Sequence, residues 1–247
     1  MEVHHHSHTP GKKWTHYFWE FSMLFLAVFC VFLAEYYLEH VIENQREKKY
    51  AASLMEDLIN DTIDFNGNII SWQKALTHID TVRNEIEKKP IARNPLSLYR
   101  CAALLNVYNS FVYHDRTIGQ LKNAGNFRLI RQKEIADSLV EYDAWIITIL
   151  RNMEEHFADV SMDRRRLQDQ IFNSKFFFLR MRPLLLDSAA KREPGVIEIG
   201  NKDVLFQFYN CLYTCRFHIN AQILFQKSLL QKATGLITQL KQQYNLK

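Results

Sequence analysis

The chain opens with an apolar run that is flanked by aromatic side chains. Residues 21–34, FSMLFLAVFCVFLA, carry no charge, and as a helix they would span about 21 Å. With the aromatic residues on both sides the helix covers residues 17–38 and about 33 Å, enough for the roughly 30 Å hydrocarbon core of a bilayer. Trp and Tyr rings favour the headgroup level of a membrane. This pattern predicts a transmembrane helix over residues 17–38.

Apolar residues at helical spacing follow this run. No Gly or Pro interrupts residues 12–66, so we expect the transmembrane helix to continue as a stalk. An apolar stripe on the stalk is formed by Ala51, Leu54, Leu58 and Phe65. The tripeptide Asn-Gly-Asn at 66–68 predicts the first turn, and residues 69–89 a second helix.

The middle of the chain carries signals for helix starts and ends. Asn-Pro at 94–95 has the pattern of an N-cap and a first helical residue, and predicts a third helix that reaches about Tyr108. Thr117 and Gln120 have the spacing of a capping box. Gly125 can adopt the left-handed conformation, so we expect it to end the helix that Thr117 starts.

Two long helices are expected in the second half of the chain. Residues 126–182 contain no Gly or Pro, and their apolar residues alternate three and four apart. One heptad position holds Ile135, Tyr142 and Ile149, and the other holds Leu139, Ile146, Met153 and Val160. A final helix is predicted over about residues 202–244, where Gln226 interrupts the apolar stripe. That stripe consists of Leu205, Leu212, Ile219, Ala233 and Leu240.

Composition supports an all-helical protein. Seven glycines and five prolines in 247 residues are too few for the frequent turns of a β-sandwich or barrel. We therefore predict an all-α protein with a short tail over residues 1–16, a transmembrane helix over residues 17–38, and a stalk with an elongated antiparallel helical bundle over residues 39–247. The expected long exposed loop covers residues 186–201.

The apolar run has other possible interpretations. A cleaved signal peptide would need small residues before its cleavage site, but Ala34 at that site would place Phe32 at the −3 position. A lipoprotein signal is disfavoured because Phe29 precedes Cys30. A buried core helix is the strongest alternative, since short apolar runs often form one. We expect Glu20 to lie at the membrane interface and to pair with His16.

Charge and cysteine content exclude further classes. Lys and Arg number 31 against 27 Asp and Glu, which gives a net charge of +4, but the two signs are interspersed along the chain. The sequence therefore does not predict nucleic-acid binding. Of the four cysteines, Cys30 lies inside the apolar run, and Cys211 and Cys215 are four residues apart on a predicted helix. This arrangement disfavours a disulfide framework.

Some residues could bind a metal ion. The tract His4, His5, His6 and His8 offers imidazole ligands, but a terminal tail lacks neighbours that would hold them in place. Cys211, Cys215 and His218 share one side of the last helix and form a partial zinc site. Packing residues beside the apolar stripe are the favoured interpretation of these three side chains. We therefore predict no metal and no cofactor.

The remaining candidates for chemistry are also more readily explained as structural. The pair His114-Asp115 resembles the dyad of helical metal-dependent phosphohydrolases, but further His and Asp ligands cannot be assigned. His156 continues the heptad position of Ile149 and predicts a histidine at the edge of the core. The run of arginines at 164–166 predicts a solvated helix face. The sequence contains no nucleotide-binding loop and none of the common hydrolase motifs.

Three segments of the chain resemble a known family. They are HTPGKKWTHYFWEFSMLFLAVFCVFLAEYYLEH near the start, TIGQLKNAGNFRLI at 117–130, and LITQLKQQYNL from Leu236. These segments are similar to an uncharacterised family (a domain of unknown function) of single-pass, membrane-anchored helical proteins of Bacteroidota. The resemblance implies one amino-terminal span and a helical carboxy-terminal domain, and it supplies no established activity, ligand or catalytic residue. It also implies that Lys12, Lys13 and Trp14 form a cytoplasmic flank.

These observations lead to one main functional hypothesis. We expect a non-enzymatic, single-pass protein of the bacterial inner membrane, whose helical domain faces the periplasm and acts as an interaction or scaffold module at the cell envelope. Its partners would be the bilayer, a second copy or another envelope protein, and no nucleic acid. The alternatives are a sensor-like ligand-binding bundle that needs a partner for output and, third, a metal-dependent enzyme.

Overall fold

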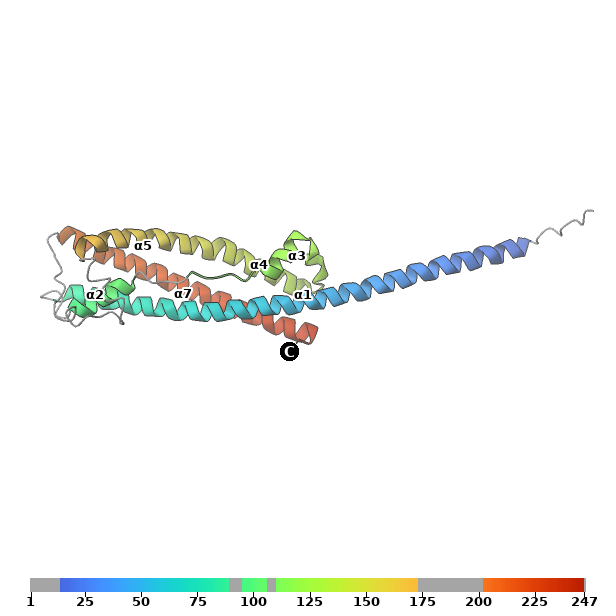
Figure 1. Cartoon of the computed structure of the whole chain (residues 1–247), viewed down its shortest axis with the longest axis horizontal. Coiled ribbons are helices and arrows are strands. Elements are labelled where there is room, and N and C mark those ends of the chain that lie inside the picture. The colour runs from blue at the N-terminus through green and yellow to red at the C-terminus, as the bar shows by residue number, and fades with distance from the viewer. Residues whose placement is uncertain (1–13, 89–94, 106–109, 173–201, 247) are drawn as a thin grey trace, which may run out of the picture. The chain divides into compact units, whose positions relative to one another are not determined.

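The described part of the chain is almost entirely helical. A computed structural model describes residues 14–88, 95–105, 110–172 and 202–246 (Figure 1), and these residues contain helices and no strand. The prediction of an all-α fold is therefore confirmed. The chain divides into two units, residues 1–49 and residues 50–247. Helix α1 (Trp14–Glu87) contributes to both units.

In the first unit, α1 exposes its apolar side chains. The large apolar residues from Trp14 to Leu38 are exposed, and the most apolar stretch is not buried against any described residue. The helix is long and apolar enough to cross a membrane, and its exposure argues against the alternative of a soluble core helix. The expected pair also forms, since His16 Nε2 lies 3.1 Å from Glu20 Oε1.

In the second unit, long helical segments pack along one another. They are residues 50–87 of α1, the continuous segment of α4 (Lys133–Ala144), η2 (Trp145–Leu150) and α5 (Arg151–Ile171), and helix α7 (Lys202–Tyr244). The bounds of α7 confirm the predicted final helix. Residues 173–182 and 186–201, assigned above to the end of a helix and to a loop, lie outside the described residues.

Contacts along these segments show their directions. Asp80 of α1 pairs with Arg216 of α7 at 3.1 Å, and Glu87 accepts a hydrogen bond from Tyr209, so α1 and α7 run antiparallel. Lys232 pairs with Glu141, and the Cys211 thiol contacts the Val160 carbonyl oxygen, so α7 is also antiparallel to the α4–α5 segment. Consequently α1 runs parallel to the α4–α5 segment, and the connection between them must return along the whole unit.

The apolar core forms two clusters. The first, which includes Leu58 and Leu236, packs beside α3 (Arg116–Asn123), and the second, which includes Trp72 and Phe208, packs beside α2 (Pro95–Leu104). Polar side chains occupy the sequence positions between the clusters on each long segment. They are Asn68 on α1, Glu154 on α5 and Gln226 on α7, while Gln222 lies one turn earlier, between Ile219 and Ile223 of the second cluster.

Helix α1 passes through the predicted turn. Residues 66–68 are helical, so the predicted boundary between a first and a second helix is wrong. A Gly inside a helix costs about 1 kcal/mol relative to Ala, but Phe65 and Ile69 on either side are buried in the two clusters. Burial of those side chains stabilises more than the glycine costs. The other helix starting in this region, α2, begins at the predicted Pro95 but ends at Leu104.

The predicted heptad pattern holds only in the first part of the long segment. Ile135, Tyr142 and Ile146 are buried as expected, but Ile149 is 41% exposed and Leu150 is buried in its place. The reason is η2, a π-helical turn, which inserts one residue into the repeat. After η2, the buried positions come one residue later in the chain than predicted. For example, Phe157 is buried where His156 was expected, and His156 is exposed. The expectation of a core-edge His156 is therefore wrong.

This register shift can be tested with a matched pair of substitutions. We expect Leu150→Ala to lower the free energy of unfolding by about 3 kcal/mol, because it leaves a cavity in the core. Ile149→Ala should cost less than about 1 kcal/mol, since its side chain is largely in solvent. Thermal unfolding of the detergent-solubilised chain, followed by circular dichroism, would measure both. The reverse order of effects would restore the uninterrupted heptad.

Candidate functional site

The most polar part of the second unit lies where α1 meets the segment before α3. Asp57 and Asp61 are one helical turn apart on α1, and both carboxylates are buried. They accept hydrogen bonds from the backbone of residues 114–117 and from side chains of neighbouring elements. We call Asp57, Asp61 and the groups bonded to them the carboxylate cluster.

Asp57 caps the start of α3. Its Oδ2 accepts a hydrogen bond from the Thr117 backbone N–H at 2.9 Å, and its Oδ1 lies 3.0 Å from the Arg116 guanidinium. Thr117 is the second residue of α3, and its Oγ1 has no hydrogen-bond partner among the described residues. The predicted capping box at Thr117 and Gln120 is thus wrong, because a carboxylate of another helix performs that role. Gly125 has the expected left-handed conformation, with φ 62°.

Asp61 binds His114 and Tyr142. Its Oδ1 accepts the His114 backbone N–H at 3.0 Å and lies 3.0 Å from His114 Nδ1, while Oδ2 accepts the Tyr142 hydroxyl at 2.7 Å. Burial raises the pKa of Asp61 above its ordinary value of 3.8, although the hydrogen bonds act in the opposite direction. Burial also raises the pKa of Tyr142, so its hydroxyl stays protonated and remains a donor.

Two further carboxylates hold the same segment. Asp143 on α4 accepts a hydrogen bond from the Tyr113 hydroxyl at 3.1 Å and pairs with Lys122 of α3. Glu154 on α5 accepts the Phe111 backbone N–H at 2.8 Å. Because each of these carboxylates bonds to the segment that leads into α3, their arrangement is suited to fastening this connection to the bundle.

The residues predicted as possible phosphohydrolase ligands belong to this fastening. His114 bonds to Asp61, whereas the neighbouring Asp115 is exposed. Within the described ranges, no group of three or more His, Cys, Asp or Glu side chains is placed to hold a metal ion. Sequence reasoning missed Asp57 and Asp61, since nothing in their local pattern indicates a partner some 50 to 60 residues away.

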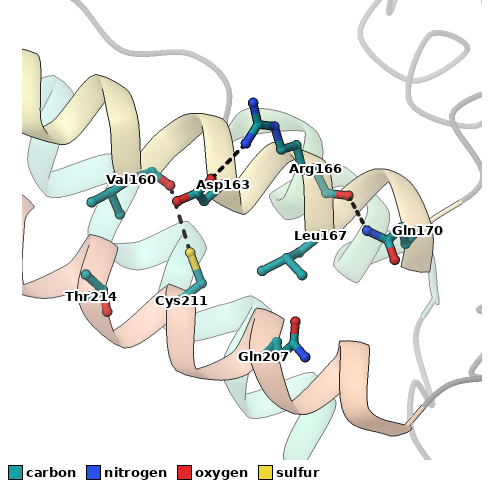
Figure 2. A pocket seen from close by; sticks show the side chains of 8 residues that line it. All are labelled: Val160, Asp163, Arg166, Leu167, Gln170, Gln207, Cys211 and Thr214. Atoms are coloured by element: carbon teal, nitrogen blue, oxygen red, sulfur yellow. Dashed lines mark hydrogen bonds and ion pairs between the residues drawn. The ribbon is translucent and has the colours of Figure 1, made fainter.

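The partial zinc site lies beside a groove between α5 and α7. Cys211 lines this groove together with Asp163 and Arg166, and its thiol lies 3.9 Å from the Val160 carbonyl oxygen (Figure 2). Cys215 is buried and donates a hydrogen bond that lowers the pKa of Cys211, with a smaller effect of the Arg164 guanidinium. The four histidines of the terminal tract, His4, His5, His6 and His8, lie outside the described residues.

His218 and the charged residues at the rim of the groove contact other groups of the chain. The His218 ring packs edge-on against Phe217, with the ring centres 5.7 Å apart. At the rim of the groove, Arg166 Nη1 lies 3.3 Å from Asp163 Oδ1, so these two charges pair with each other (Figure 2). The Gln170 amide in turn donates to the Arg166 carbonyl oxygen at 3.3 Å.

The three consecutive arginines do not share one environment. Arg165 and Arg166 are exposed as predicted, but Arg164 is only 2% exposed and donates a hydrogen bond to Gln168 at 2.6 Å. The prediction of a solvated face is therefore wrong for Arg164. Its burial follows from the π-helical turn, which rotates positions 157, 161, 164 and 168 toward the core.

A second feature is an exposed apolar surface along α1 and α7, which we call the α1–α7 face. Its members are Ile59, Ile63 and Ile70 on α1, and Phe206, Tyr213, Phe217 and Leu224 on α7. The α7 members lie along the side of α7 that contacts α1 through Arg216 and Tyr213. Asp80 of α1 pairs with Arg216 of α7, and Phe217 follows Arg216 in the chain. On α1, Ile63 and Ile70 precede Thr77 at intervals of seven residues, and Thr77 is one turn before Asp80.

The α1–α7 face differs in charge from the rest of the bundle. On α7, which is described throughout, the exposed residues between Phe206 and Gln239 are mostly aromatic, amide, hydroxyl or Gly, and Arg216 and Lys227 are the charged ones. The exposed side of α5 is instead mostly charged, with Arg151, Glu155, Asp159, Asp163, Arg165, Arg166 and Asp169. Depletion of charge with enrichment of aromatic residues is typical of protein interfaces.

Comparisons with known proteins give no assignment. No protein-family model, no curated protein and no solved structure matches the chain. The function is therefore inferred from the physical features of the carboxylate cluster and the α1–α7 face.

The capping role of Asp57 can be tested against the capping box. We expect Asp57→Ala to lower the free energy of unfolding by about 2 kcal/mol, because it removes a helix cap and a charged hydrogen bond. Thr117→Val should leave stability unchanged or raise it, since it removes a buried hydroxyl that bonds to no described group. Chemical unfolding of the full chain in detergent would measure both. A loss of about 1 kcal/mol in Thr117→Val would instead support capping by Thr117.

Asp61 should make stability depend on pH. Because its folded-state pKa is raised, the stability linked to its protonated form is complete below about pH 3.8 and is lost as the pH rises through the folded-state pKa. Asp61→Asn cannot titrate. We therefore expect the unfolding free energy of the wild type minus that of the variant to fall as the pH rises above about 4. Unfolding curves at several pH values would show this, and a constant or growing difference would contradict it.

Proposed function

We propose that this protein is a non-enzymatic, single-pass membrane protein whose second unit is an interaction module. The single observation that carries the proposal is the contrast between the charge-poor, aromatic α1–α7 face and the charged outer side of α5. Both are outer sides of the same bundle, so the difference is not explained by solubility.

Membrane anchoring is supported by the first unit. The apolar side chains of residues 21–34 are almost all exposed, and that amount of exposed apolar surface is costly in water. We place the protein in the bacterial inner membrane with its second unit in the periplasm, as the resemblance to Bacteroidota anchored proteins implies. In this arrangement α1 holds the module at the membrane, where its partner would also be held or recruited.

A non-enzymatic role is supported by how the polar groups are used. The carboxylates of the carboxylate cluster accept hydrogen bonds from backbone N–H groups and from tyrosine hydroxyls, which occupy them structurally. A general acid or base needs access to a substrate proton. The fastening role of Asp57 and Asp61 leaves the α1–α7 face as the feature that still requires an explanation.

The proposal predicts a matched difference between two surface variants. In cells that produce the full chain, a chemical crosslinker should give a crosslinked species that Leu224→Glu loses, because a charge on the face opposes its burial. Met162→Glu, on the exposed side of α5, should retain that species. Membrane fractions would be compared by immunoblotting. Identical patterns in both variants, or recovery of the wild type in the soluble fraction, would overturn the proposal.

A further inference from the structure

Residues on the outer side of α7 form a second heptad repeat, in which every member is exposed except the half-buried Asn220. Phe206, Tyr213 and Asn220 follow one another at intervals of seven, and so do Asn210, Phe217 and Leu224. Together they alternate three and four apart, which is the a and d pattern of a coiled coil. We call these six residues the outer seam. It is separate from the buried repeat of α7, which includes Leu212 and Ile219.

The outer seam carries no charge. Arg216, which adjoins it, is paired with Asp80 of α1 at 3.1 Å, so its charge is compensated within the chain. Arg83 of α1 covers the Tyr213 ring, with its guanidinium carbon 3.7 Å from the ring centre, and donates a hydrogen bond to the Tyr213 hydroxyl. The seam therefore presents an aromatic, aliphatic and amide surface, and the neighbouring cations Arg83 and Arg216 are bound to groups of their own chain.

We propose that the outer seam binds a second copy of this chain, with the two α7 helices parallel. This inference rests on the proposed function, which supplies the membrane anchor and the interaction role. A symmetric contact places each patch against itself, so an uncharged surface avoids the repulsion that a charged one would meet. An acidic or basic partner would find no complementary charge on the seam.

The positions of the seam residues favour the parallel arrangement. Two copies anchored in one bilayer share the same orientation across the membrane, and a parallel pair brings each seam residue beside its counterpart. Asn210 is then the one Asn at an a position of the seam, with Phe206 and Tyr213 on either side of it, and an Asn at an a position selects register and a two-stranded state. Confinement to a membrane raises the effective concentration, so a short seam is sufficient for association.

The test uses photo-crosslinking of the full chain in its native membrane. Two differently tagged copies are produced together, and Phe217 is replaced by the photoreactive analogue benzoylphenylalanine. We expect a crosslinked product that carries both tags, with its attachment point between residues 213 and 224 of the second copy. The same analogue at Met162, on the exposed side of α5, is the matched control and should give little of this product.

A charge in the seam provides the second readout. In the chain that carries the photoreactive analogue at position 217, Leu224→Asp should reduce the doubly tagged product about tenfold. The reason is that two carboxylates would face each other in the pair. Leu224 is 67% exposed, so this variant should keep the circular dichroism spectrum and the thermal unfolding midpoint of the wild type.

The outcomes separate this inference from the proposed function. A product with a different protein at Phe217, and none with the second tag, would overturn pairing but leave the interaction module in place. An attachment point outside α7 of the second copy would overturn the parallel seam. Equal doubly tagged products at Phe217 and Met162, or no product at Phe217, would also overturn the inference, and the Leu224→Glu comparison would then decide on the module itself.

Discussion

The second unit depends on how its long connection is fastened to α1. Because α1 and the α4–α5 segment run parallel, the chain between them must return along the bundle instead of making a short turn. Loops and short helices have little apolar surface with which to hold themselves in place. The buried carboxylates of Asp57 and Asp61 supply the missing hold, since each accepts a backbone N–H of this connection. Asp57 also accepts a hydrogen bond from the Arg116 guanidinium of the connection, and Asp61 accepts one from the Tyr142 hydroxyl of α4. Without them α3 would lose its cap and its position.

Polar residues inside the bundle add specificity to this arrangement. Asn68, Glu154 and Gln226 occupy positions between the two apolar clusters, and Arg164 bonds to Gln168 within the second. A purely apolar core would allow α7 to slide by a heptad at a low cost, since one Leu resembles another. A polar layer opposes such slippage, because a shifted helix would bury polar atoms against hydrocarbon. The protein therefore accepts some loss of stability in exchange for one register.

The outer surfaces of the bundle carry the functional interpretation. The exposed side of α5 is mostly charged. Helix α7 buries one apolar repeat in the bundle and has a second, uncharged repeat on its outer side. A helix with two apolar repeats can pack in two directions at once. Within a chain that also has a helix able to span a membrane, such a helix is well suited to joining anchored molecules side by side.

The sequence alone determined the features that depend on local pattern. The apolar run of residues 21–34, the bounds of α7 and the left-handed Gly125 all follow from composition and spacing over a few turns. Tertiary structure decided the rest. Burial of the flanking residues carries α1 through Gly67, and a π-helical turn exchanges Ile149 for Leu150 in the core, a one-residue insertion that no periodicity reveals in advance. Likewise the cap of α3 comes from Asp57, because a hydrogen bond depends on distance in space and not on separation along the chain.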